Sequence, residues 1–163
     1  MLILAAVPCA AAATTVPCSS DWGSGWSTGG GGGFAFTCGG AEGTPSPYTG
    51  PSAGVGGSGA YYFAEVNSPR KGGDYFTLTY DGSACSVDGE GVSLVTFYYH
   101  MHGSNMGTLL VINAAEEAVW SLSGNQGDLW TEVTVAVHSP SRRRSASSIY
   151  TRGNGWEGDA ALA

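Results

Sequence analysis

Glycine interrupts this chain so often that few stretches long enough for a helix remain. The 163 residues contain 27 glycines, together with eight tyrosines. Glycine weakens a helix interior and supplies the positive φ angles that tight turns require. The chain is therefore expected to be an all-β protein, with short strands joined by tight turns.

Short runs of Tyr, Phe, Val and Thr follow one another from residue 60 onward, with Gly, Asp, Asn and Ser between them. The clearest run is 130–138, where three valines alternate with largely polar residues, so that one face meets a core and the other meets solvent. The segment 18–59 is rich in Gly, Ser, Thr and Pro and predicts loops around one or two short edge strands. The predicted strands are 60–66, 74–80, 92–100, 107–113, 117–122, 130–138, 147–151 and 157–162. Eight strands without amphipathic helices between them predict two packed antiparallel sheets, a jelly-roll-like β-sandwich.

The charge balance of the chain is acidic. Thirteen Asp and Glu residues against six Lys and Arg give a net charge of −7, which disfavours a surface for nucleic acid or an anionic membrane. Hydrophobic residues make up 42% of the chain and charged residues 12%, which is enough apolar material for one folded domain. The basic cluster Arg142–Arg144 fits a solvated loop between strands, and a patch for an acidic partner is the alternative.

The first residues, Met1 to Ala13, form an apolar, alanine-rich stretch that resembles a secretory signal peptide. No Lys or Arg precedes the apolar run, so a wrongly assigned gene start is the alternative. The stretch is too short for a transmembrane helix, which needs roughly 20 apolar residues, and no insertion of this chain into a membrane is expected. The expected organisation is a leader over 1–17 and a single domain over 18–163.

Four cysteines bear on the compartment of the chain. Cys9 lies in the candidate leader, which leaves Cys18, Cys38 and Cys85 in the domain. Three cysteines in a secreted chain predict one disulfide and one free or intermolecular thiol, and Cys18 to Cys38 is the preferred pair. Closing a loop of about 20 residues would contribute on the order of 3 kcal/mol. Three reduced thiols in a cytosolic protein are the alternative, and the absence of a Cys-x-x-Cys pair disfavours zinc.

Two glycine-rich motifs match the patterns of catalytic or phosphate-binding sites. Gly25–Gly29 fits the Gly-x-Ser-x-Gly pattern around Ser27, and Gly54–Gly59 fits Gly-x-Gly-x-x-Gly. Both patterns carry their chemistry only between a strand and a following helix. The predicted strand 60–66 follows the second motif, and neither motif has a helix after it. We therefore interpret both motifs as loop sequences.

His100 and His102 would share one face of a predicted strand and could bind one metal ion with His138 or a carboxylate. No third ligand is adjacent in the sequence, so we interpret them as core or surface histidines. Three acids near a glycine-containing turn could bind calcium, but their spacing is not that of an EF-hand loop. We interpret that segment as a polar hairpin connection. The three acids are Asp81, Asp88 and Glu90.

Two ordered blocks of sequence indicate a family. The segment 95–103, VTFYYHMHG, followed by GTL at 107–109, resembles the "FWYHMYG … GTL" stretch of MAM domains, named for meprin, a neuropilin-type antigen and receptor tyrosine phosphatase mu. Trp120, the sequence GNQG at 124–127 and Trp130 reproduce a second block of that family in order. Asn and Gly tolerate the left-handed backbone of turns, so we interpret 124–127 as a turn between strands and not as a binding site.

Two further blocks extend the resemblance to most of the chain. GP at 50–51, GAYYFAE at 59–65 and GGD at 72–74 are similar to the family's "GP … GYYMYIE … GD" run, with SP at 68–69 between them. RGNGWEGDAAL at 152–162 is similar to the terminal "RG … GDIAL" signature. The matching blocks run in the family's order from about 50 to 162.

The resemblance implies a jelly-roll β-sandwich that acts in adhesion or extracellular recognition without a catalytic step of its own. The expected partner is a protein or a second copy of the domain, with a glycan as a further option, at a cell surface or in the matrix. The chain is then secreted or part of the ectodomain of a membrane protein. One alternative is a non-catalytic fragment of a larger secreted protease that contains a MAM domain. The other is a structural matrix protein linked through Cys85.

The cysteine pattern of the family is not reproduced. The family has cysteines where this chain has Ser24 and Leu94, so its usual disulfides cannot form. The pairing of Cys18 with Cys38 is therefore an inference from this chain and is not implied by the resemblance.

Family members can hold a structural cation through acidic residues near both ends of the domain. Asp21 and Asp159 lie where two such acids are expected, and the resemblance implies them as ligands of a structural Ca²⁺. Two other acidic positions of the family are occupied by Ala35 and Ala163, which leaves few hard oxygen ligands.

Overall fold

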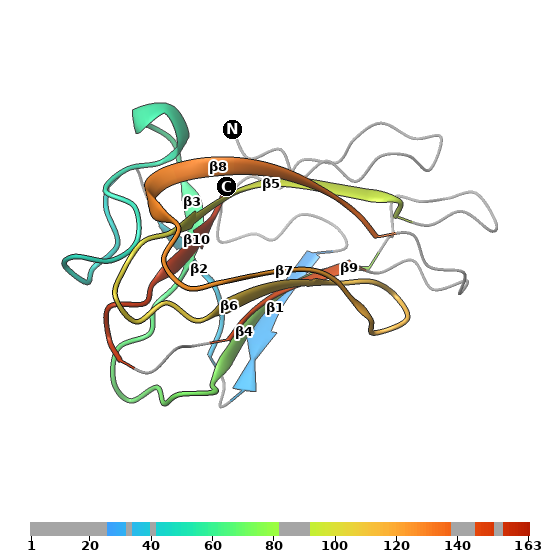
Figure 1. Ribbon diagram of the computed structural model, residues 1–163, viewed down its shortest axis with the longest axis horizontal. Helices are drawn as coiled ribbons and strands as arrows, with labels where there is room; N and C mark the ends of the chain where they lie inside the picture. Colours follow the sequence, from blue (N-terminus) through green and yellow to red (C-terminus); the bar gives the residue numbers. More distant parts are fainter. Residues whose placement is uncertain (1–25, 32–33, 40–41, 82–91, 138–145, 152–154) are drawn as a thin grey trace.

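The computed structural model describes residues 26–31, 34–39, 42–81, 92–137, 146–151 and 155–163 (Figure 1). They form two five-stranded sheets, in the orders β1-β4-β9-β6-β7 and β2-β3-β10-β5-β8. The strands are β1 (Trp26–Gly30), β2 (Thr37–Gly39), β3 (Tyr61–Ala64), β4 (Tyr75–Tyr80), β5 (Leu94–Met101), β6 (Thr108–Ile112), β7 (Ala118–Ser123), β8 (Gly127–Ala136), β9 (Ala146–Thr151) and β10 (Ala160–Leu162). No helix among the described residues is long and apolar enough to cross a membrane.

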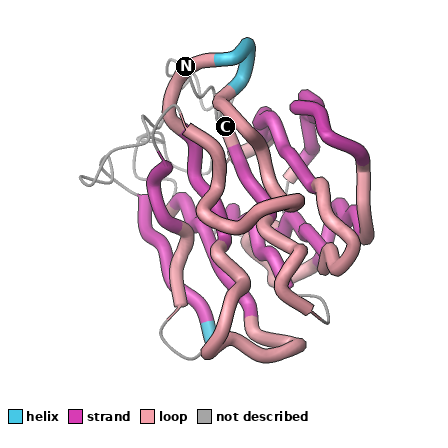
Figure 2. Tube along the Cα trace, turned by 90° about the vertical axis from the view of Figure 1, so that its left-hand side faces the viewer, coloured by secondary structure: helices cyan, strands magenta, loops and turns pink. Residues whose placement is uncertain are grey.

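The sheets have jelly-roll topology. Every pairing between described strands is antiparallel. Strands β3 to β10 are divided between the sheets as in an eight-stranded jelly roll, with β3-β10-β5-β8 in one sheet and β4-β9-β6-β7 in the other. Strands β1 and β2 add one edge strand to each sheet. Figure 1 shows the two layers with β5 and β8 above β6 and β7, and Figure 2 shows strands and loops making up almost all of the described chain. The predicted two-sheet antiparallel sandwich is confirmed.

All eight strands predicted from the sequence occur. The largest shifts of a boundary are three residues, at the start of the last strand, which covers 160–162 instead of 157–162, and at the start of β8, which begins at Gly127 instead of 130. Two short edge strands within 18–59 are also confirmed. The prediction of a hairpin after residue 80 is wrong, because β4 and β5 belong to different sheets and the connection crosses from one layer to the other. Of the three acids predicted on that connection, Asp88 and Glu90 lie outside the described residues.

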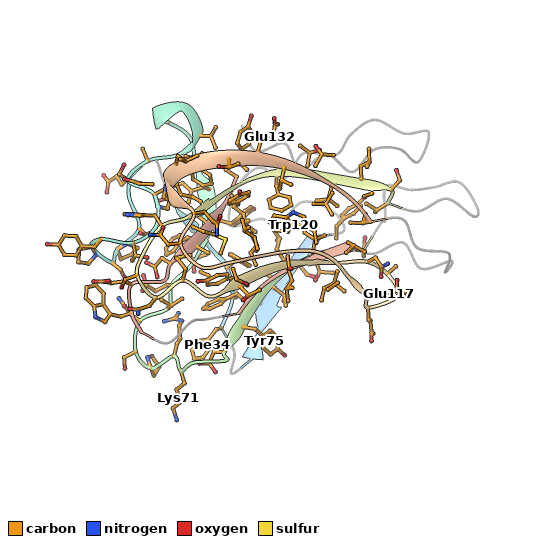
Figure 3. The ribbon with its side chains drawn as sticks, in the orientation of Figure 1. Phe34, Lys71, Tyr75, Glu117, Trp120 and Glu132 are labelled. Carbon is orange, nitrogen blue, oxygen red and sulfur yellow. The ribbon has the colours of Figure 1, made fainter. Side chains whose placement is uncertain are left out.

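The core lies between the layers and follows the period of two. Phe76 and Leu78 of β4 and Phe97 of β5 are buried, while their neighbours along each strand are more exposed. Trp120 of β7 packs edge-to-face on Phe97 at 5.8 Å between ring centroids, and Figure 3 shows it in the space between the layers. This contact joins the two sheets, and aromatic pairs of this kind add about 0.5–1.5 kcal/mol beyond the area that they bury.

Several loops meet at one end of the sandwich. Met101 at the end of β5 pairs with Gly127 at the start of β8 and with Ala160 at the start of β10. The connections that leave these strands therefore lie together, on the left of Figure 1. They are residues 102–107, 124–126 and 155–159, and the loop 42–57 between β2 and β3 packs against them. We call this region the loop end.

Candidate recognition surface

Thr49 joins three segments of the loop end. Its Oγ1 donates to the carbonyl of His102 at 2.9 Å and accepts from the amide of Asp159 at 2.8 Å. The amide of Gly50 donates to the same His102 carbonyl at 2.9 Å. Loop 42–57 is thus fixed to the segments that follow β5 and precede β10, although 53 and 110 residues separate Thr49 from its two partners.

Tyr48, next to Thr49, combines an unfavourable backbone with an exposed ring. Its φ is 64°, a value that aromatic residues rarely adopt, and its side chain is 79% exposed. Two hydrogen bonds hold the turn around it, from Thr44 Oγ1 to the Thr49 carbonyl at 2.8 Å and from the Thr44 amide to the Pro51 carbonyl at 3.1 Å. A strained conformation persists where the surrounding structure determines it, and this turn places the side chain of Tyr48 in solvent.

Two hollows open beside this turn. The larger, of about 310 Å³, is lined by Tyr48, His102 and Asp128 together with residues of the 43–52 segment. The smaller, of about 200 Å³, is lined by His100, Asp128 and Trp130 with part of the 51–57 segment. Pro51, Ser52 and Asp128 line both hollows, so the two are neighbours on one surface. Concave surfaces with a few convergent polar groups are the usual places for ligand binding.

Asp128 meets both histidines that the sequence analysis singled out. His100 Nε2 lies 3.1 Å from Asp128 Oδ1, and His102 Nδ1 lies 3.9 Å from the same oxygen. Burial lowers the pKa of His100, because it disfavours the imidazolium, although the charge of Asp128 opposes the shift. A carboxylate can only accept hydrogen bonds, so neutral His100 donates from Nε2 and fixes the orientation of Asp128.

Trp130 forms the wall behind the smaller hollow. Its Nε1 donates to the Ala53 carbonyl at 2.8 Å, which attaches loop 42–57 to β8. Its ring lies edge-to-face against His100 and Tyr61, at 5.4 and 5.6 Å between centroids. The buried side of the surface is therefore rigid.

The structure shows where the two histidines considered as metal ligands lie. His100 is buried, as expected for a core histidine, and His102 is half-buried. A carboxylate, Asp128, meets both histidines, but in the described part of the chain no group of three or more His, Cys, Asp or Glu side chains could hold a metal ion. His138 lies outside the described residues.

The turn at 124–127 is structural, as expected. Gly124 and Gly127 have φ values of 78° and 91°. The side chain of Asn125 accepts from the Gly127 amide at 2.9 Å, and that of Gln126 donates to the Ser123 carbonyl at 2.9 Å. These side-chain hydrogen bonds close the turn itself.

The other motifs also keep their structural interpretation. Ser27 lies within strand β1, opposite Thr79 of β4, and not on a turn between a strand and a helix. The motif Gly54–Gly59 contains a single 3-10 turn at Val55–Gly57, and the strand β3 follows. Neither motif has the strand–turn–helix context that its chemistry requires.

Asp159 is fully buried beneath the loop end. Its Oδ1 accepts from the Val66 amide at 3.0 Å, while Oδ2 is buried without a hydrogen-bond partner. Burial raises the pKa of Asp159 to about 6, the amide of Val66 opposes the shift, and the charge of Glu65 adds to it. Arg70 and the Ser46 hydroxyl also favour the charged form. The carboxylate at neutral pH is therefore less stable in the folded chain than in water.

The pKa of Asp159 predicts a pH dependence of folding stability. Because the folded-state pKa, about 6, lies above the unfolded value near 3.9, the folded state binds this proton more tightly. Stability from this group is greatest below pH 4 and falls as the pH rises through 6. Relative to Asp159→Asn, the natural chain should lose about 3 kcal/mol of unfolding free energy between pH 4 and pH 7.5. Urea unfolding of both proteins across this range measures the difference, and a constant difference would contradict the prediction.

The same two proteins test the structural Ca²⁺ expected at Asp21 and Asp159. Asp21 lies outside the described residues, so the pair stays a prediction. The buried oxygens Asp159 Oδ2 and Glu65 Oε2 lack hydrogen-bond partners, which is compatible with a cation nearby. A rise in Tm on adding calcium that Asp159→Asn abolishes would support the site. Equal Tm values with calcium and with chelator would contradict it.

The structure describes only one of the two cysteines in the predicted disulfide. Cys38 of β2 is in a disulfide, and Cys9, Cys18 and Cys85 all lie outside the described residues. The pairing of Cys18 with Cys38 therefore stays a prediction. The leader at 1–17 and the cluster Arg142–Arg144 also lie outside the described residues.

Two residues of this surface were not singled out from the sequence. Asp128 directly follows the turn at 124–127, so its position at the start of β8, beside the end of β5, could have been inferred from the pairing of those strands. Tyr48 stands in a Gly-, Pro- and Ser-rich loop without periodicity. Its position depends on hydrogen bonds to residues that lie far away in the sequence.

The fold places the chain among the jelly-roll β-sandwich domains. It is similar to the K3 adhesin domain of Lys-gingipain from Porphyromonas gingivalis, with a TM-score of 0.56 and 14% identity, covering 85% of this chain and 88% of that one. It is also similar to the K2 adhesin domain of Lys-gingipain, with a TM-score of 0.54 and 15% identity, covering 85% and 86%. At these identities the likeness shows the fold alone.

The chain belongs to the MAM domain family, meprin/A5/mu, whose model matches residues 18–162. It is 35% identical over 128 residues to human MAM domain-containing glycosylphosphatidylinositol anchor protein 1, covering 72% of this chain and 13% of that protein. It is 36% identical over 74 residues to Neuropilin-1 of Xenopus laevis, covering 42% of this chain and 8% of that protein. The resemblance inferred from the four sequence blocks is confirmed, and the chain spans a small part of the length of these relatives.

Proposed function

We propose that this chain is a non-catalytic extracellular recognition domain that binds a protein partner through its loop end. Membership in the MAM family supports the role, and a relative named as a glycosylphosphatidylinositol anchor protein supports a location at the cell surface. Recognition residues are commonly mounted on loops that a rigid sandwich positions.

The distribution of exposed apolar side chains carries this proposal. Six large hydrophobic side chains among the described residues are notably exposed: Tyr48 (79%), Leu129 (56%), Trp156 (46%), Tyr75 (44%), Val119 (37%) and Leu94 (36%). The three most exposed belong to the loop end or to the adjoining start of β8. Tyr48 lines the larger hollow and Leu129 the smaller. Scattered exposed residues are normal, whereas their concentration at one end of the sandwich supports a surface for a partner.

Trp156 is fixed to the same end by its neighbours. The carbonyl of Glu157 accepts from the amide of Asn105 at 2.9 Å, and the Glu157 side chain accepts from the Ser104 hydroxyl. Residues 155–157 therefore pack on the β5–β6 connection, next to His102. Tyrosine and tryptophan are enriched among the residues that dominate binding energy at interfaces, which supports assigning this role to Tyr48 and Trp156.

The proposal is tested with the chain secreted as a fusion to a dimeric carrier and applied to a panel of cell types. We expect binding to at least one cell type. The triple variant Tyr48→Ala, Leu129→Ala, Trp156→Ala should weaken that binding on the order of 30-fold, since truncating residues central to an interface costs 2 kcal/mol or more.

The matched control replaces the three less exposed residues by Tyr75→Ala, Leu94→Ala and Val119→Ala. It should bind as the natural chain does, with Tm values measured for all three proteins. The absence of binding to any cell, or an equal loss in both variants, would contradict the proposal. Dimers of the chain without the carrier that dissociate with reductant would instead support the matrix protein linked through Cys85.

A further inference from the structure

We propose that the larger hollow of the loop end binds the guanidinium group of an arginine side chain from the protein partner. This inference rests on the proposed recognition function and adds the chemistry of the partner. It follows from a carboxylate, an aromatic ring and an uncompensated negative charge that line one hollow.

Asp128 supplies the carboxylate. Its side chain is 63% exposed and lines both hollows. Oδ1 accepts from His100 at 3.1 Å, while Oδ2 makes no hydrogen bond within the described residues. Because His100 donates as a neutral imidazole, it orients the carboxylate without cancelling its charge. A planar guanidinium suits such a group, since it can offer two parallel N–H donors to a carboxylate.

Tyr48 supplies the ring. It lines the same hollow as Asp128, and the hydrogen bonds of Thr44 and Thr49 fix the turn that carries it. Guanidinium groups stack on the faces of aromatic rings. Because the backbone that carries the ring is held in advance, little backbone entropy is lost on binding, which favours the ring as a stacking surface.

No basic side chain of the described residues compensates this charge. Their Lys and Arg residues are Arg70 and Lys71, and neither lines the two hollows. The guanidinium of Arg70 lies over Phe34, 4.8 Å from the ring centroid, so it has a separate contact. The chain as a whole carries a charge of −7, which attracts a cationic partner more than a neutral polyhydroxylated one.

The test is an NMR titration of the whole isotope-labelled chain at pH 7.5 with N-acetyl-arginine amide. We expect shifts of the amide signals of residues 48–50, 52, 102 and 128, with those of 94 and 119 unchanged. N-acetyl-citrulline amide, which has a similar shape without the charge, should bind at least 10-fold more weakly. N-acetyl-lysine amide should also bind more weakly than the arginine compound, and 0.5 M NaCl should weaken binding.

Matched variants assign the two groups. Asp128→Asn and Tyr48→Ala should each reduce the affinity for N-acetyl-arginine amide at least fivefold. The controls Glu132→Gln and Tyr75→Ala should leave it unchanged, because these exposed residues lie on outer parts of the two layers, away from the hollow (Figure 3). Asparagine retains an oxygen for the His100 hydrogen bond, so the fold of this surface is preserved.

Several results would overturn the inference. They are the absence of shifts at 48, 102 and 128, equal affinity for citrulline, equal or tighter binding of lysine, and shifts of the same signals by methyl mannoside or cellobiose alone. Cell binding separates this inference from the proposed function. If Asp128→Asn binds cells as tightly as the natural chain, the arginine site fails and the recognition function stands.

Discussion

Replacing Gly103 by alanine is expected to lower the free energy of unfolding by about 2–6 kcal/mol. Gly103 has a φ of 147°, and a Cβ placed there would lie 2.2 Å from the Glu157 carbonyl oxygen and 2.7 Å from Thr49 Oγ1. The first of these atoms belongs to the backbone and cannot rotate away. The loop segments joined by Thr49 would have to separate, so binding at the loop end should weaken together with stability.

Gly124→Ala is the matched control for this prediction. Gly124 also has a positive φ, 78°, but nothing lies within 4 Å of a Cβ added there. Its replacement should cost only about 1–2 kcal/mol, the ordinary penalty of a left-handed alanine. Urea unfolding followed by tryptophan fluorescence measures both variants. Equal losses of unfolding free energy would show that glycine is necessary at 103 only because of its backbone conformation. The close approach of three segments would then not matter.

Removing one hydroxyl, in Tyr150→Phe, is expected to lower the free energy of unfolding by about 2–5 kcal/mol. The Tyr150 hydroxyl accepts from the Gly107 amide at 2.8 Å and donates to the Gly158 carbonyl at 2.5 Å. Phenylalanine preserves the packing on Phe76 but leaves both backbone groups without these partners. Each such loss away from water costs about 1–3 kcal/mol.

Tyr75→Phe serves as the control for Tyr150, because Tyr75 is 44% exposed on the β4 strand of the same sheet. Its unfolding free energy should stay within about 0.5 kcal/mol of the natural chain. Chemical unfolding and calorimetry should agree for both variants. A loss below 1 kcal/mol in Tyr150→Phe would mean that Gly107 and Gly158 find other partners.

Strands such as β4 and β8 could be predicted from the sequence because they bury one face more than the other. The alternation of Phe76, Leu78 and Tyr80 in β4 is a local signal, as is that of Val133 and Val135 in β8 with Val137 directly after it. The division of the strands between two sheets is not local. The connection from β4 to β5 has the polar residues of a hairpin, yet it crosses between layers, because the partners of both strands lie far away in the sequence.

The recognition surface was harder to predict from the sequence than the strands. His100 and His102 could be placed on one strand, but the residue that joins them, Asp128, belongs to β8 and meets them through strand pairing. Tyr48 owes its position to hydrogen bonds that end at His102 and Asp159. Residue type predicts well which side chains are buried. The position of an exposed ring such as that of Tyr48 depends on contacts between distant segments, and these leave no periodic pattern in the sequence.

The central position of β10 has a consequence for biosynthesis. This strand is inserted between β3 and β5, and Ala163 exchanges two backbone hydrogen bonds with Tyr98. During translation, β3 and β5 therefore emerge from the ribosome long before the strand that separates them. The second sheet can close only after Leu162 has been synthesised, so until then the nascent domain carries two unpaired strand edges, which are prone to aggregation.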